Sequence, residues 1–266
     1  MTAIRHKRVL ITGSGRGMGL ALAKRFAASG AQVILSDIHL DALSDARKLL
    51  PDAEAIAMDV TCPEAIQAAR ETLHSNGGPI DILVNNAGVV FGGAFADVPL
   101  ERHLQTLRVN TEGLLAVTHV FLPDLIARPE AHIVNMASVS GLIGLPFGAA
   151  YAASKWAAIG FGESLRLELK ELGHDHVRLT VAAPGYINTG LFDGVGAPRL
   201  MPFLDPDDLA RTIVRAVRSN RPYVYTPLLV RLTPMLKGLL PVDIQDRVMA
   251  FLGATTSMKS WHGGSS

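Results

Sequence analysis

Residues 8–20 read RVLITGSGRGMGL, and this stretch decides the fold. Residues 8–11 form a short apolar run that predicts a buried strand, and a helical pattern occupies residues 20–28. The glycines between them let the backbone turn tightly, and a helix N-terminus presents unpaired N–H groups and the positive end of its dipole. The stretch therefore predicts a strand, a glycine-rich turn and a helix that together bind an anion such as a pyrophosphate.

The rest of the chain repeats this alternation of short apolar runs and longer helical patterns. Further strands are expected at residues 32–36, 55–58, 82–84, 132–136, 178–182 and 223–225. Such alternation is typical of parallel strands with helices on both faces, so we expect an α/β fold with a doubly wound sheet of about seven strands. Thr61 and Glu64 are spaced as a capping box for a helix with Pro63 in its first turn. No linker or repeat divides residues 1–266, which are expected to form one domain.

Charge and cysteine content limit the partners of the chain. Its formal net charge is +1, with Lys and Arg scattered along the sequence, which argues against nucleic acid as a partner. The single cysteine, Cys62, cannot form an internal disulfide, so we expect a reducing, cytoplasmic location. The most apolar stretch, residues 228–240, is interrupted by Arg231, Pro234 and Lys237 and is too short for a transmembrane segment.

The glycine-rich turn has the spacing T-G-x-x-x-G-x-G, because Met18 stands where the common pattern G-x-G-x-x-G has its third glycine. Asp37 ends the second strand, where a carboxylate can accept hydrogen bonds from ribose hydroxyls and would repel a 2′-phosphate, which favours NAD. Arg16 could instead pair with that phosphate and favours NADP, so the two residues disagree and NAD is preferred. The turn residues expected at the cofactor are Gly13, Ser14, Arg16, Gly17, Met18 and Gly19.

Two more loops follow predicted strands. Asp59 and Val60 come after the third strand, and Asn86, Ala87 and Gly88 come after the fourth. Ligands of open α/β sheets bind beyond the carboxyl ends of the strands, so Asp59 could meet the adenine and the second loop is expected beside the cofactor. Each loop alone is equally compatible with a simple turn.

Three polar residues are predicted to converge at this edge. Ser138 follows the fifth strand, and Tyr151 and Lys155 lie one helical turn apart in the next helix. A free tyrosine has a pKa of about 10, so it needs a neighbouring positive charge to ionise near neutral pH. Lys155 could lower the pKa of Tyr151, which could then exchange a proton with a substrate oxygen.

The ordered motifs resemble those of short-chain dehydrogenases/reductases, and the resemblance covers nearly the whole chain. They are T-G-x-x-x-G-x-G, N-N-A-G at residues 85–88, Asn110, Ser138, Y-x-x-x-K at residues 151–155, and Pro184-Gly185.

This resemblance implies a Rossmann-like fold and an NAD-dependent oxidoreductase that interconverts a secondary alcohol and its ketone. Tyr151 would be the general acid/base, Ser138 would orient the substrate oxygen, and Lys155 would also hold the nicotinamide ribose. Asn110 would position a water that connects Lys155 to solvent. Residues expected on the nicotinamide side are Pro184, Gly185, Ile187 and Thr189.

Apolar residues point to a hydrophobic alcohol or ketone as substrate. The loop 186–204 resembles the family's substrate loop, and an apolar extension follows at residues 227–260, where Pro234 and Pro241 should divide short amphipathic pieces. This extension could cap the pocket, pack in a subunit interface or make weak contact with a membrane surface, in that order of preference. Further apolar candidates for the pocket are Val90, Phe91, Leu142, Ile143 and Tyr186.

Two other functions stay open at this stage, an NADPH-dependent carbonyl reductase and a non-catalytic dinucleotide-binding protein. No metal is expected, because His174, Asp175 and His176 lie in a loop where such residues are usually solvated. A homodimer or homotetramer is implied only by the family resemblance.

Overall fold

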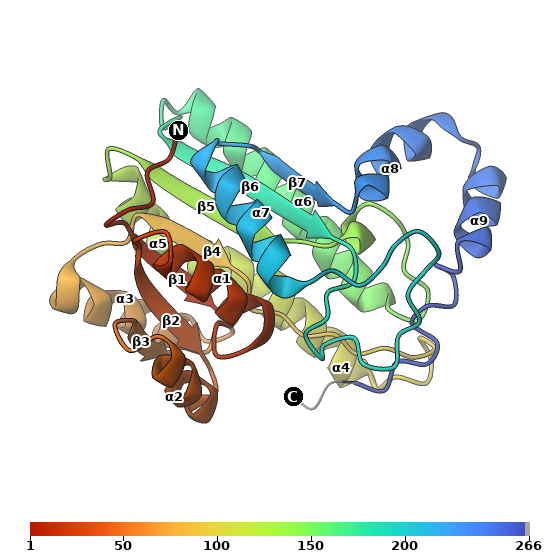
Figure 1. The fold of residues 1–266 in the computed structure, drawn as a ribbon, viewed down its shortest axis with the longest axis horizontal. Helices are drawn as coiled ribbons and strands as arrows, with labels where there is room; N and C mark the ends of the chain where they lie inside the picture. The colour runs from red at the N-terminus through yellow and green to blue at the C-terminus, as the bar shows by residue number, and fades with distance from the viewer. Residues whose placement is uncertain (264–266) are drawn as a thin grey trace.

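A single parallel sheet of seven strands organises the computed structural model, which describes residues 1–263 (Figure 1). The strands are β1 (Arg8–Thr12), β2 (Gln32–Asp37), β3 (Glu54–Ala57), β4 (Ile82–Asn85), β5 (Ala131–Met136), β6 (Val177–Pro184) and β7 (Tyr223–Thr226). Their order in the sheet is β3-β2-β1-β4-β5-β6-β7, so β1 pairs with both β2 and β4. The winding direction reverses between β1 and β4, and in such sheets the crevice beyond this point is where ligands bind.

Strand β1 explains the continuous apolar runs in the sequence. Val9 and Ile11 pack in one core with α1 and α7, whereas Leu10 packs in a second core on the other face, and all three are 0% exposed. Successive side chains of a strand point to opposite faces, so a strand covered on both faces must be apolar throughout. The predicted doubly wound sheet is confirmed, and each predicted strand ends within two residues of the observed one.

Helices cover both faces of the sheet. Side chains of α1, α2 and α7 contribute to the first core, and those of α3, α5 and α6 to the second. Two short turns interrupt the pattern, a π-helical turn η1 (Arg108–Glu112) between α4 and α5, and a 3-10 turn η2 (Val139–Gly141) after β5. The helices are α1 (Gly17–Ala27), α2 (Leu40–Leu49), α3 (Pro63–Gly77), α4 (Leu100–Leu107), α5 (Gly113–Ile126), α6 (Ala149–Glu171), α7 (Pro206–Arg218), α8 (Leu228–Leu239) and α9 (Val242–Phe251).

The predicted capping box at the start of α3 is wrong, although Pro63 does begin the helix. Cys62 is the residue before the helix, and no side chain caps it. Thr61 instead donates hydrogen bonds from its N–H (2.8 Å) and its hydroxyl (2.7 Å) to Asp59 Oδ1. The carboxylate is a stronger acceptor close by, so it forms a local turn that takes Thr61 away from the helix end.

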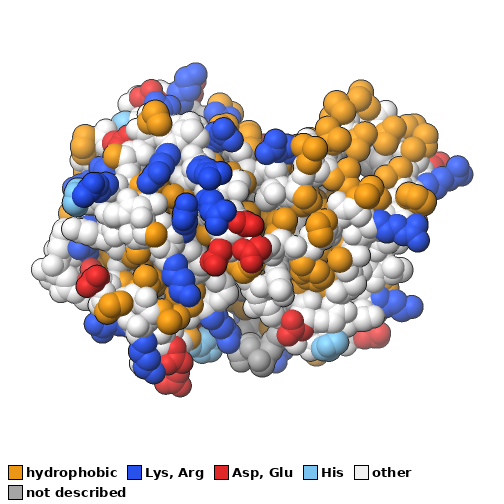
Figure 2. All heavy atoms as spheres, viewed as in Figure 1, with side chains coloured by type: hydrophobic (Ala, Val, Ile, Leu, Met, Phe, Trp, Pro, Cys, Tyr) orange, Lys and Arg blue, Asp and Glu red, His pale blue; other side chains and the backbone are white. Residues whose placement is uncertain are grey.

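Helices α8 and α9 project from the body of the protein (Figure 1). The predicted division at Pro241 is confirmed, but the one at Pro234 is wrong, because α8 runs through this residue. A proline inside a helix removes one backbone donor, and here the remaining turns continue the helix. The two helices carry exposed apolar side chains, such as Leu239 and Phe251, that form a visible group in Figure 2. Within residues 1–263, no helix is long and apolar enough to cross a bilayer.

Candidate active site

The glycine-rich turn and the loop after β4 are joined into one structure. Asn86 Nδ2 donates hydrogen bonds of 2.9 Å to the carbonyl oxygens of Thr12 and Gly13. The N–H groups of Asn86 and Ala87 each lie 3.0 Å from Thr12 Oγ1. At Gly19, a Cβ atom would come 2.1 Å from the Gly13 carbonyl oxygen, so only glycine permits this approach. The backbone cradle predicted from the sequence is therefore present, with its shape fixed by side chains from two loops.

Asp37 lies directly beside this cradle. Asp37 is buried at the end of β2. Its Oδ2 accepts a hydrogen bond from Gly15 N at 3.0 Å, and its Oδ1 accepts one from His39 N at 3.1 Å. Arg16 is the residue that precedes α1. Ser14 Oγ accepts a hydrogen bond from the backbone of β2, and Met18 is buried in α1. A negative charge is thus held where the second strand meets the glycine turn.

The loop after β6 also reaches the glycine turn. A Cβ atom on Gly17 would lie 3.5 Å from Thr189 Cβ, which places Thr189 next to the start of α1. Pro184 ends β6, Gly185 N donates to Thr226 O at 2.8 Å, and Ile187 forms an isolated bridge with Leu204. The predicted nicotinamide-side loop therefore lies across from the cradle.

The loop after β3 has other contacts. Asp59 Oδ1 accepts a hydrogen bond from the Thr61 hydroxyl. Val60 packs against the start of α5, where a Cβ on Gly113 would be 2.8 Å from Val60 Cγ2. Gly88 lies beside Asn110, because a Cβ there would be 3.2 Å from Asn110 Oδ1.

The three predicted catalytic side chains meet at the carboxyl end of β5. Ser138 follows this strand, and Tyr151 and Lys155 lie on the first turns of α6. Lys155 Nζ donates a hydrogen bond of 2.8 Å to the carbonyl oxygen of Met136 and lies 5.5 Å from the centre of the Tyr151 ring. Ser138 and Tyr151 line the same cavity, and the Ser138 side chain is close enough to Tyr151 to influence the pKa of its hydroxyl. All three residues are buried, at 6–8% exposure, so their interactions are screened little by solvent.

The pKa values of the pair differ from the expectation that Lys155 lowers the pKa of Tyr151. Burial raises the pKa of Tyr151 above its ordinary value of 10.0, the Ser138 side chain lowers it in part, and the nearby Tyr186 raises it further. Burial lowers the pKa of Lys155 from 10.5 to about 8. The direction for Tyr151 is opposite to the expectation because removal from water disfavours the phenolate more than the residues around it stabilise it.

Asn110 lies in the π-helical turn η1 and not in a regular helix. Its Nδ2 donates to Val89 O at 2.9 Å and to Ser154 Oγ at 3.0 Å, and its Oδ1 accepts from Val89 N at 2.8 Å. Asn110 therefore ties the loop after β4 to α6, one residue from Lys155. Single π-turns inserted in helices are frequent at functional sites.

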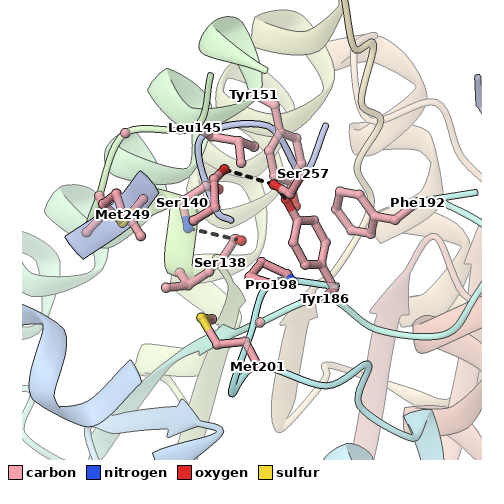
Figure 3. A pocket seen from close by; sticks show the side chains of 15 residues that line it. Ser138, Ser140, Leu145, Tyr151, Tyr186, Phe192, Pro198, Met201, Met249 and Ser257 are labelled. Atoms are coloured by element: carbon pink, nitrogen blue, oxygen red, sulfur yellow. Dashed lines mark hydrogen bonds between the residues drawn. The ribbon is translucent and has the colours of Figure 1, made fainter. Parts of the chain in front are cut away.

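A cavity opens from Ser138 and Tyr151 (Figure 3). The empty space within it and in the open solvent at its mouth is together about 430 Å³, of which about 30 Å³ has room for the centre of a water molecule, and most of its wall is apolar. The predicted Ile143 and Tyr186 line it, whereas Val90 belongs to the adjoining apolar cluster. Phe91 and Leu142 do not line it, since Phe91 packs under the Arg102 guanidinium at 4.7 Å and Leu142 packs against the core behind.

Sequence reasoning did not single out several residues of the cavity wall. These are Val139, Ser140, Gly144, Leu145, Pro198, Met249, Ala254 and Ser257. Three of them come from the C-terminal extension, so the first of its three predicted roles, capping the pocket, is the one its contacts support. Arg199 N donates to Leu252 O at 2.7 Å, and Trp261 Nε1 donates to Leu191 O at 3.1 Å. We call residues 186–203 and 252–261 together the cover of the cavity.

Comparison with known proteins agrees with this geometry, which is that of a dinucleotide-dependent oxidoreductase. The family model described as short chain dehydrogenase matches residues 7–199. The chain belongs to this family, whose members bind NAD(P), and it is an oxidoreductase.

Named relatives cover most of the chain. Epidermal retinol dehydrogenase 2 of Mus musculus is 34% identical over 252 residues, which are 92% of this chain and 82% of that protein. The 1-deoxy-11-beta-hydroxypentalenate dehydrogenase of Streptomyces exfoliatus is 34% identical, over 84% of each chain. A short-chain dehydrogenase/reductase from Burkholderia phymatum, crystallised in complex with NAD, is 26% identical with a TM-score of 0.82, over 93% of this chain and 97% of that one.

Proposed function

We propose that the protein is an NAD(H)-dependent oxidoreductase that interconverts a hydrophobic secondary alcohol and its ketone, with Tyr151 as the general acid/base. The observation that carries the proposal is the position of the Tyr151 hydroxyl. The residue is buried, and it lines an apolar cavity together with Ser138. A proton donor or acceptor in such a place can act on a substrate oxygen with little competition from water.

The residues around Tyr151 have complementary roles in this proposal. Ser138 holds the reacting oxygen next to the Tyr151 hydroxyl, so that the proton is exchanged along a hydrogen bond. Lys155, fixed by the Met136 carbonyl, contributes positive charge that favours the phenolate. Asn110 holds the loop after β4 against Ser154, the residue before Lys155. In this proposal it positions a water through which Lys155 exchanges protons with solvent.

The cofactor assignment is supported by the fit of the glycine cradle. Because Gly13 and Gly19 approach each other closely, no side chain of theirs covers the backbone at the start of α1. The N-terminus of this helix favours a pyrophosphate there. When bound, the nicotinamide accepts or donates the hydride. Asp37, held beside the cradle by Gly15, favours ribose hydroxyls and therefore NAD over NADP. The Burkholderia phymatum relative crystallised with NAD supports the same choice.

A hydrophobic substrate is supported by the cavity wall and by two kinds of relatives. Phe192, Met201 and Met249 present apolar surface to the cavity. The names of relatives refer to retinol and to 17-beta-hydroxysteroids, which are both bulky and apolar. Retinol is a primary alcohol, whereas a 17-beta-hydroxysteroid is a secondary one, so the steroid relative supports the secondary alcohol. We therefore place the substrate among lipophilic secondary alcohols and ketones.

The test is a comparison of Tyr151→Phe with the wild type. Reduced-nicotinamide absorbance is followed with NAD or NADP and a panel of lipophilic secondary alcohols that includes sterols and aryl carbinols. We expect turnover to fall by roughly 10²–10⁴-fold, the usual contribution of general acid–base catalysis, with dinucleotide affinity changed little. Tyr223→Phe is the matched control, because Tyr223 Oη bonds Glu163 away from the cavity. Near wild-type turnover of Tyr151→Phe would refute the proposal.

A further inference from the structure

Ser140 has a buried hydroxyl without a hydrogen-bond partner in the wall of the cavity. The residue is 3% exposed, and its Oγ makes no hydrogen bond. A buried hydroxyl that loses its water without gaining a partner is destabilising, so such groups are few in folded proteins and usually have a reason. Here the residue belongs to the cavity lining (Figure 3).

The other polar side chains of the cavity have a partner or a role in the proposed reaction. Ser138 Oγ accepts a hydrogen bond from Ser140 N, and Tyr186 Oη lies 2.8 Å from Ser257 Oγ, which also donates to Ala254 O. Tyr151 has the role of proton donor or acceptor in the proposed reaction. Among the described residues that line the cavity, Ser140 therefore supplies the one side-chain hydroxyl that has neither a partner nor a role in the proposed reaction.

Ser140 also lies very close to the reacting position. It occupies η2 immediately after Ser138, and its backbone N–H donates a hydrogen bond of 3.2 Å to Ser138 Oγ. The two serine side chains therefore belong to the same short section of wall. If Ser138 holds the reacting oxygen of a substrate, the group of that substrate nearest to Ser140 would be on a neighbouring carbon.

We propose that Ser140 is a specificity-determining residue that binds a second oxygen atom of the substrate, on a carbon adjacent or close to the reacting one. The substrate class is accordingly a hydrophobic secondary alcohol or ketone with a neighbouring hydroxyl or carbonyl group. A serine hydroxyl donates and accepts hydrogen bonds, so it serves either group. The inference rests on the proposed function and adds the second oxygen to its substrate.

The experiment uses two probes that differ by this oxygen. Benzoin is a secondary alcohol with an adjacent carbonyl group. The second probe is 1,2-diphenylethanol, called diphenylethanol below, which has the same carbon skeleton and hydroxyl group but no carbonyl group. In wild type and Ser140→Ala, kcat/KM is measured for both by NADH formation. We expect the benzoin-to-diphenylethanol ratio to fall about tenfold in Ser140→Ala, the scale of one lost hydrogen bond to a buried group, with diphenylethanol itself little affected. Ser75→Ala, an exposed serine on α3, is the matched control.

A binding readout separates this inference from the proposed function. In the NAD-loaded Tyr151→Phe protein, which is not required to turn over, benzoin should raise the Tm more than diphenylethanol does, and adding Ser140→Ala should abolish the difference. Ser140→Ala alone should leave the Tm unchanged or raise it, because it removes an unpaired buried hydroxyl. Equal effects of Ser140→Ala on both probes, equal Tm shifts, or a lower Tm for Ser140→Ala alone would overturn the inference. Absence of turnover with both probes, alongside a Ser140-dependent Tm difference, would count against the proposed function only.

Discussion

Tyr186 Oη and Ser257 Oγ lie 2.8 Å apart and form a buried hydrogen bond between residues 71 positions apart in the sequence. Tyr186 follows the sheet strand β6, whereas Ser257 belongs to the C-terminal extension. A backbone hydrogen bond from Gly196 N to Ser257 O at 3.2 Å reinforces the connection. The two parts of the cover are therefore joined to each other next to Tyr151, whose ring Phe192 contacts edge-on.

Loss of this hydrogen bond should weaken substrate binding. In Tyr186→Phe we expect KM for a lipophilic alcohol to rise roughly fivefold, because a buried hydrogen bond contributes about 1 kcal/mol, while kcat stays within about twofold. Steady-state kinetics at saturating NAD measure the effect. Ser257→Ala should produce the same change, and the double variant should add nothing further, since both substitutions break one interaction. Fully additive effects of the two substitutions would contradict this coupling.

Asp37 should determine the choice between the two dinucleotides. In Asp37→Ser we expect the ratio of kcat/KM with NADP to kcat/KM with NAD to rise at least about tenfold, because the substitution removes a charge that repels the 2′-phosphate. Asp45→Asn is the matched control, since Asp45 is an exposed carboxylate of α2 that pairs with Lys48. A wild-type preference for NADP, or an unchanged ratio in Asp37→Ser, would assign the choice to Arg16.

Acid should destabilise the protein through His132. Burial, and to a smaller extent Arg178, lowers the pKa of His132 from 6.5 to about 3. Below pH 6.5, His132 binds a proton in the unfolded chain but stays neutral in the folded protein. The free energy of unfolding is therefore unaffected by His132 above this pH and decreases as the pH falls toward 3. Between pH 7.5 and pH 4.5 the loss from this residue is about 3 kcal/mol.

Urea unfolding at both pH values tests this assignment. His132→Gln should be less stable than wild type at pH 7.5, because His132 hydrogen-bonds Thr180 at 2.8 Å, but it should lose less stability on acidification. His119→Gln, at an exposed position of α5, should keep the wild-type loss. An equal loss in His132→Gln and wild type would show that other groups govern the acid response.

The sheet and the catalytic cluster could be predicted because their signals are local. Each buried strand is apolar along its whole length, as Val9, Leu10 and Ile11 illustrate, and the Tyr151–Lys155 spacing is that of one helical turn. The glycine turn is likewise contiguous in sequence. Such features do not depend on how distant segments pack.

The cavity wall could not be predicted to the same extent, because it depends on distant packing. Ser257 and Met249 face the catalytic site only because the extension folds back over it, and no local pattern indicates this contact. Phe91 looked like a pocket residue but packs under Arg102. The rise of the Tyr151 pKa in the protein alone also depends on burial by these remote segments, which no local pattern indicates.

The cavity wall is built almost entirely outside the sheet. Apart from Tyr151 on α6, Gly185 directly after β6 and Met249 on α9, its residues lie in the connection after β5 and in the cover. Strand register and the glycine turn do not depend on their identity, so substitutions there can accumulate without loss of the scaffold. The cavity wall can therefore change while the sheet and the glycine turn stay the same, so the substrate range of the protein can diverge, in nature or in the laboratory, without a change of scaffold.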